Sequence, residues 1–174
     1  MENTKPRKIT GLFRDRESAQ EAYKYLHDIG YTPSDINLVM SEEVRKTYFD
    51  DVEHYTEKGT KTVETALKGS AIGGTVLAVA TILATVGISV FVPVLGVFIG
   101  GPLAAGIIGG SAGIITGGMC GALIGADIPA EKAEVYETGI KDGKIFFMVE
   151  PRNEEEALAI EKNWTENLGE EIHW

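Results

Sequence analysis

A stretch of 58 residues from Gly69 to Ala126 contains no Asp, Glu, Lys, Arg or His. The glycines that recur at every fourth position of its second half are Gly109, Gly113, Gly117, Gly121 and Gly125. Because residues four apart lie on nearly the same face of a helix, these glycines predict a groove without side chains. Such faces let helices approach closely in lipid. The stretch therefore predicts close helix packing inside a membrane.

The uncharged stretch divides into two candidate membrane helices. Residues 69–90 and 103–126 are each long enough to cross a hydrocarbon core of roughly 30 Å. Between them, residues 91–102 contain two prolines and three glycines, which predict a turn. Lysines precede the first helix at 58, 61 and 68, so the positive-inside rule predicts that both ends of the hairpin lie in the cytoplasm. We expect a membrane location, with both termini and the soluble part cytoplasmic.

The small residues of this hairpin are our candidate site. Doublets of glycine offer surface for close approach on two sides of the second helix, so one side can close the hairpin while the other contacts a second subunit. We therefore expect a homo-oligomer whose partners are itself and membrane lipid. The predicted helix-packing and oligomerisation residues are Gly74, Ala78, Gly106, Gly109, Gly110, Gly113, Gly117, Gly118, Gly121 and Gly125. The alternatives are a simple membrane anchor and a soluble hairpin buried in a larger assembly.

The flanks of the stretch carry two similar β-α-β patterns. The first has a strand over 8–14, a helix with Asp15 as its N-cap, and a strand over 35–40. The second has a strand over 144–149, a helix that begins at Asn153, and a last strand over 170–174. Asn153 and Glu156 have the spacing of a capping box.

Two such units most simply join in one sheet. We expect an α+β fold, a ferredoxin-like four-stranded sheet that is split by the transmembrane hairpin. The predicted parts are 1–41 as the first half of this domain, 42–68 as a polar helical linker, 69–126 as the hairpin, and 127–174 as the returning helix and second half.

Charge and composition exclude several functions. The net charge of -10 argues against nucleic acid as a partner, because phosphate binding requires clustered Lys and Arg. Cys120 is the only cysteine, so no disulfide framework exists, and an inert thiol is expected. His27, His54 and His173 lack the spacing of metal ligands, and the acidic residues at 50, 51 and 53 lack a calcium-loop pattern. We expect no catalytic residues, no cofactor and no metal, and therefore no enzyme.

Three phrases of the sequence carry a resemblance to a known family. They are GLFRDRESAQEAYKYLHDIGYTPSDINLVM, the glycine-rich apolar insert, and PAEKAEVYETGIKDGKIFFMV. Together they resemble the bacterial general stress protein 17M-like and low-temperature-induced proteins. The resemblance implies a stress-linked bacterial membrane protein and supplies no catalytic residues.

Three functions follow from these observations. The favoured one is a stress-associated membrane scaffold that self-assembles through the glycine-zipper hairpin. The second is a membrane-anchored regulatory or sensor domain that binds a small ligand or ion. The third is a pore, against which the lack of ionisable residues in the stretch argues.

Overall fold

A computed structural model of the chain describes residues 8–49, 89–104 and 113–174. Its centre is one antiparallel sheet of six strands in the order β3-β4-β2-β5-β1-β6. The strands are β1 (Ile9–Phe13), β2 (Ile36–Ser41), β3 (Ser89–Val92), β4 (Val97–Gly100), β5 (Ile145–Val149) and β6 (Gly169–His173). The fold is therefore α+β, with the two ends of the described chain side by side in β1 and β6.

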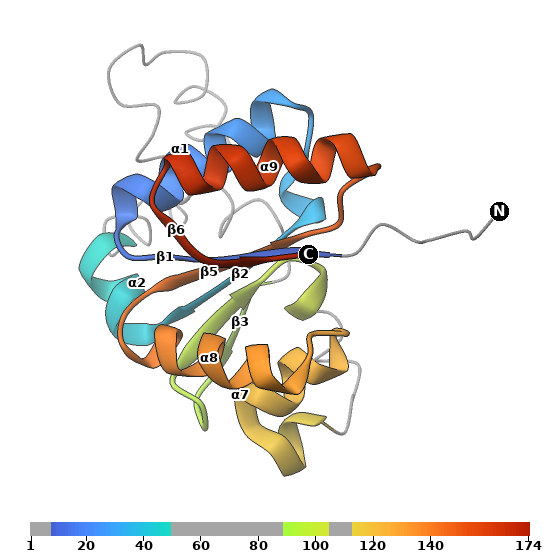
Figure 1. The fold of residues 1–174 in the computed structure, drawn as a ribbon. Coiled ribbons are helices and arrows are strands. Elements are labelled where there is room, and N and C mark those ends of the chain that lie inside the picture. Colours follow the sequence, from blue (N-terminus) through green and yellow to red (C-terminus); the bar gives the residue numbers. More distant parts are fainter. Residues whose placement is uncertain (1–7, 50–88, 105–112) are drawn as a thin grey trace, which may run out of the picture.

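Helices cover both faces of this sheet (Figure 1). The described helices are α1 (Arg16–Asp28), the 3₁₀ turn η1 (Pro33–Asp35), α2 (Glu42–Phe49), α7 (Gly113–Gly125), α8 (Ala130–Lys141) and α9 (Glu154–Glu166). In Figure 1, α1 and α9 lie above the sheet, and α7 and α8 lie below it. The central strands β1, β2 and β5 are consequently buried on both faces.

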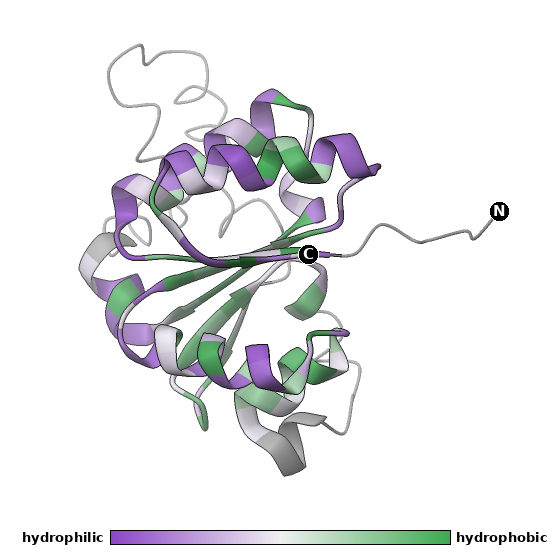
Figure 2. Cartoon of the chain, viewed as in Figure 1, coloured by the Kyte–Doolittle hydropathy of each residue, from purple (hydrophilic) through white to green (hydrophobic). Residues whose placement is uncertain are grey.

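Side-chain alternation along the strands divides the core in two. Phe147 of β5 packs with Trp164 of α9 and with the apolar side of α1. The neighbouring Phe146 faces the other way and packs against Tyr136 of α8, with ring centroids 4.9 Å apart. In Figure 2 the hydrophobic colour follows the strands and the sides of the helices that face them. Successive residues of one strand therefore support different layers.

The four-stranded ferredoxin-like sheet predicted from the sequence is wrong. Strands β3 and β4 form a hairpin that pairs with β2 and extends the sheet to six strands. This hairpin occupies most of residues 91–102, where we expected the turn between two membrane helices. Its apolar residues Val97 and Ile99 are buried in the core beside α8, which explains why this segment lacks charge. The two extra strands, and the helices on both faces of the sheet, depart from the predicted ferredoxin-like fold.

The membrane-spanning hairpin is also wrong, and with it the membrane location and the membrane scaffold. In the described part of the chain, no helix combines the length and the apolar character needed to cross a membrane. Helix α7 has 13 residues and is interrupted at Gly118, which has φ 61° and ψ -145°. Thirteen residues span only about 20 Å at 1.5 Å each. Its Met119 and Leu123 are buried against the protein's own core instead of facing lipid.

Candidate functional site

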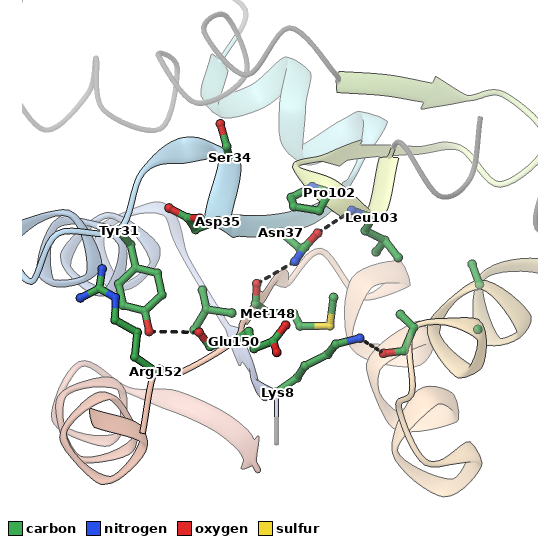
Figure 3. Close-up of a pocket in the computed structure, with 14 residues that line it drawn as sticks. Lys8, Tyr31, Ser34, Asp35, Asn37, Pro102, Leu103, Met148, Glu150 and Arg152 are labelled. Carbon is green, nitrogen blue, oxygen red and sulfur yellow. Dashed lines mark hydrogen bonds between the residues drawn. The ribbon is translucent and has the colours of Figure 1, made fainter. Parts of the chain in front are cut away.

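A pocket of about 500 Å³ opens at one end of the sheet (Figure 3). At this end β1 and β2 begin, β5 ends, and the chain leaves β4 toward α7. Segments far apart in the sequence thus meet around one space. The lining residues are Lys8, Tyr31, Ser34, Asp35, Asn37, Pro102, Leu103, Ala122, Gly125, Ala126, Met148, Val149, Glu150 and Arg152.

The strand register places three charged residues at this end. Val149, the last residue of β5, lies opposite Ile9 of β1 on one side and Ile36 of β2 on the other. The residues one step beyond these partners are Lys8, Asp35 and Glu150. Because antiparallel neighbours lie about 5 Å apart, the three residues are adjacent in space although they are distant in sequence. Charge gathers here because a strand end is where the chain leaves the apolar interior.

Asn37 holds the floor of the pocket together. The residue is only 7% exposed. The Nδ2 group donates to the carbonyl of Met148 at 3.2 Å, and Oδ1 accepts from the backbone N–H of Leu103 at 2.6 Å. These two bonds tie the segment after β4 to β5 through a side chain of β2 (Figure 3). The wall formed by Pro102 and Leu103 is thereby fixed relative to the sheet.

Lys8 joins the start of β1 to the end of α7. Its ammonium donates to the carbonyl of Ala126 at 2.8 Å and lies 3.2 Å from a carboxylate oxygen of Asp127. The carbonyl belongs to the residue that follows the last turn of a helix, where the partial negative charge of the helix dipole favours a cation. The chain turns sharply here, because Asp127 has φ 66°. Lys8 thus closes one wall of the pocket.

Arg152 and Tyr31 form the opposite wall. The guanidinium donates to the carbonyls of Ile29 at 3.1 Å and Gly30 at 2.9 Å, and lies 4.6 Å from the centre of the Tyr31 ring. The Tyr31 hydroxyl shares its one hydrogen between the Glu150 carbonyl at 3.2 Å and the Glu156 carboxylate at 3.0 Å. Burial and the bond to Glu156 hold the pKa of the Tyr31 phenol well above its ordinary value. The phenol is therefore a neutral, fixed part of the wall.

The remaining polar groups of the pocket are acceptors. Within the described chain, the Glu150 carboxylate has no hydrogen bond or ion pair. The hydroxyl of Ser34 likewise has no hydrogen-bond partner among the described residues. One oxygen of Asp35 accepts from the Thr32 N–H and hydroxyl, at 2.8 and 2.6 Å, which leaves its second oxygen available. The pocket thus presents unpaired negative charge beside an apolar floor.

The predicted glycine site has a different setting from the one expected. Gly113, Gly117, Gly118, Gly121 and Gly125 lie in α7, whereas Gly74, Ala78, Gly106, Gly109 and Gly110 lie outside the described residues. Gly118 breaks the helix, and a Cβ added at Gly125 would meet no heavy atom within 4 Å. Whether these residues mediate oligomerisation stays a prediction. Gly125 itself lines the pocket.

The single cysteine and the histidines contribute no cluster to the pocket. Cys120 is a half-buried free thiol in α7. Its burial, together with the nearby Glu137 and Glu134 carboxylates, raises the pKa of the thiol, so the reactive thiolate is disfavoured. In residues 8–49, 89–104 and 113–174, no three His, Cys, Asp or Glu side chains gather so as to hold a metal ion. His54 and the acidic residues at 50, 51 and 53 lie outside the described chain.

Sequence reasoning missed this pocket. Its charged residues come from the flanks of three strands, and nothing in the linear spacing of Lys8, Asp35 and Glu150 links them. One signal was present: Lys8 and Asp35 are the first residues of two predicted strands, and Glu150 directly follows a third. Antiparallel pairing of the correct strands would have brought those three positions together.

No protein-family model, curated protein or solved structure matches this chain. The resemblance to the general stress protein 17M-like group stays a prediction.

Proposed function

We propose that this protein is a small-molecule-binding domain whose ligand occupies the pocket at the end of the sheet. The observation that carries the proposal is the pocket itself, a cavity of about 500 Å³ whose floor is fixed by the two hydrogen bonds of Asn37 and whose exposed rim carries the Glu150 carboxylate. A concave site with apolar lining and a few polar groups is the usual setting for a small-molecule ligand.

The size and the lining of the pocket support this function. Its volume of about 500 Å³ is within the range of about 300–1,000 Å³ that is common for small-molecule sites. Met148 and Leu103 supply apolar surface, while a few charged groups at the rim can fix the orientation of a ligand. In the described chain the Ser34 hydroxyl is bonded to no base, and the Tyr31 phenol is held neutral, so we propose binding and not catalysis.

The walls are also held in place by hydrogen bonds between different elements of the fold. Asn37 is bonded on two sides, Lys8 binds the end of α7, and Arg152 binds two carbonyls of the loop after α1. A site that is held in this way is largely formed before the ligand arrives. Binding therefore costs little ordering entropy, which favours affinity for a small molecule.

The test is a screen of the full chain against a panel of small metabolites, in which thermal stability and amide NMR shifts are measured. Ligands of the pocket are expected to shift the amide signals of Leu103, Asn37 and Glu150. The variant Gly125→Leu is expected to abolish this response, because Gly125 lines the pocket and has room for a side chain. Its backbone is helical, so the variant is expected to fold.

The matched control is Ala130→Leu, which adds a similar side chain at an exposed position at the start of α8. This control is expected to keep the full response to every ligand. The proposal is wrong if compounds that stabilise the wild type stabilise Gly125→Leu equally, or if no compound of a chemically diverse panel binds.

A further inference from the structure

We infer that the ligand is a small organic cation, a primary amine attached to an apolar body. This inference rests on the proposed function and specifies the class of ligand for the same pocket. The cations of the pocket are bonded to protein oxygens, whereas its carboxylates have acceptor oxygens without a protein partner. This difference is the basis of the inference.

Both cations of the pocket are already paired with protein oxygens. The Lys8 ammonium contacts the Ala126 carbonyl at 2.8 Å and the Asp127 carboxylate at 3.2 Å. The Arg152 guanidinium contacts two carbonyls and lies 3.2 Å from a carboxylate oxygen of Glu156. A ligand carboxylate or phosphate would have to compete with these contacts for each positive charge. The pocket is therefore poorly suited to an anion.

The acceptors of the pocket are open to a donor. Both carboxylates stand on the exposed rim of the pocket: in the described chain Glu150 has no protein partner, and one oxygen of Asp35 has none. Figure 3 shows Asp35 and Glu150 on the same side of the space as Tyr31. An ammonium has three N–H donors and no acceptor, and it forms its strongest bonds with carboxylates. The head group that complements this side is a protonated amine.

The rest of the ligand is expected to be apolar. Met148 is buried in the floor, and Leu103 and Pro102 form the adjoining wall. Ala122 and Ala126 complete this surface from the end of α7 with methyl groups only. An alkyl or aromatic body that lies on these side chains would gain roughly 25 cal/mol for each Å² of apolar area removed from water.

The charge of the whole protein supports the same choice. The chain carries a net charge of -10, so its field attracts cations and repels anions before contact. Long-range attraction and local pairing therefore select the same class of ligand.

The test uses three probes with one common body: 4-phenylbutylamine, 4-phenylbutyrate and 4-phenylbutanol. Affinities for the full chain are measured by NMR titration in low salt, for the wild type, Glu150→Gln, Gly125→Leu and the control Glu21→Gln. We expect the amine to bind about ten times more tightly than the alcohol, as a charge-assisted bond provides, and the carboxylate to bind most weakly. Glu150→Gln should weaken amine binding about five-fold and leave the alcohol unchanged, since a single exposed carboxylate contributes a modest charge term. Glu21→Gln should change nothing.

The outcomes separate the ligand class from the proposed function. If the alcohol or the carboxylate binds at least as tightly as the amine and Gly125→Leu abolishes that binding, the amine inference is overturned and the binding pocket stands. If amine binding is the same in Glu150→Gln as in the wild type, the assignment of the ammonium to Glu150 is overturned. If none of the probes binds, the amine inference is overturned, and the diverse panel described above decides the proposed function. If Gly125→Leu binds the probes as well as the wild type does, both the inference and the proposed function fail.

Discussion

The side-chain oxygen of Asn37 accepts a hydrogen bond from the backbone N–H of Leu103 at 2.6 Å, across 66 positions of sequence. This contact joins the central strand β2 to the segment that leaves β4, on the inner wall of the pocket. A buried amide within a strand is uncommon, and here both of its functional groups are used. Asn37 is therefore a structural residue of the site.

Replacing Asn37 with Ala should lower the free energy of unfolding by about 1–3 kcal/mol, since a half-buried backbone N–H and a buried carbonyl each lose this partner. Urea unfolding of the full chain measures this loss. The control is Ser34→Ala, which removes an exposed pocket hydroxyl without a hydrogen bond in the described chain and should change stability little. Equal stabilities for the two variants would show that the Asn37 bonds contribute nothing.

Two turn glycines with the same sign of φ should respond very differently to alanine. Gly96 has φ 64°, and the space that an alanine Cβ would occupy there is open, so Gly96→Ala should cost about 1–2 kcal/mol for the left-handed backbone alone. Gly101 has φ 87°, and its Cβ would lie 2.1 Å from the carbonyl oxygen of Ile36. Gly101→Ala should cost at least about 2 kcal/mol more than Gly96→Ala, because β4 must move away from β2.

Urea unfolding of the two variants side by side checks this difference. A second readout is the effect of each variant on the pocket, because Gly101 precedes Pro102 and Leu103. Gly101→Ala should disturb the amide signal of Leu103 in this wall, whereas Gly96→Ala should leave it in place. Similar destabilisation by both variants would contradict the close approach of β4 and β2.

Local patterns in the sequence predicted local structure well. Asp15 caps α1 by accepting from the Ser18 N–H at 2.9 Å, and Asn153 caps α9 by accepting from the Glu156 N–H at 2.8 Å. Strands also occur close to each of the four predicted positions. These features depend on neighbours in sequence, such as a cap and its third residue or an alternating apolar run.

The capping box at α9 shows where local reasoning ends. The Asn153 half of the box forms, but the Glu156 carboxylate does not return to the Asn153 N–H. It accepts instead from the Arg152 N–H at 2.7 Å and from the Tyr31 hydroxyl at 3.0 Å. Tyr31 comes from a distant part of the chain, so a tertiary contact has taken the place of a local one. The spacing of Asn153 and Glu156 contains no information about Tyr31.

The interpretation of the uncharged segment failed for a related reason. Absence of charge indicates burial but does not state what covers the residues. Val97 and Ile99 of β4 are buried in the same core as residues of helix α8, and Met119 and Leu123 of α7 join this core. Apolar runs that are short and interrupted by glycine and proline fit strands as well as helices. Only the pairing of β4 with β2, which are far apart in sequence, shows that residues 97–100 form a strand and not part of a helix.

Alkaline pH should destabilise the protein partly through Tyr31. The pKa of its phenol is raised in the folded protein, so the folded state retains the proton more strongly than the unfolded chain does. The resulting stability is present below the ordinary pKa of 10.0 and is lost as the pH rises above it. Tyr23 and Tyr136, whose pKa values are also raised by burial, should contribute in the same direction.

Tyr31→Phe should therefore lose less stability than the wild type between about pH 9 and about pH 11.5, as measured by urea midpoints. Near neutral pH the same variant should be less stable by about 1 kcal/mol, because the hydroxyl no longer bonds to Glu150 and Glu156. Tyr25→Phe is the control, since its hydroxyl has no hydrogen bond in the described chain. An alkaline loss in Tyr31→Phe as steep as in the wild type would contradict this role.

Acid should destabilise the protein through Glu170 on the edge strand β6. Its carboxylate accepts from Lys144 at 2.6 Å and from Arg14 at 2.7 Å, and these two cations lower the pKa of Glu170 from its ordinary value of 4.5. The folded state therefore binds the proton less strongly than the unfolded chain, so the stabilisation is present above pH 4.5 and is lost as the pH falls below it.

Glu170→Gln should show a flatter fall of the urea midpoint between about pH 5 and about pH 3, while the exposed control Glu21→Gln should follow the wild type. The same acid dependence in Glu170→Gln and the wild type would exclude Glu170 as its source and direct attention to Asp15, whose pKa is also lowered, mainly by the backbone N–H of Ser18.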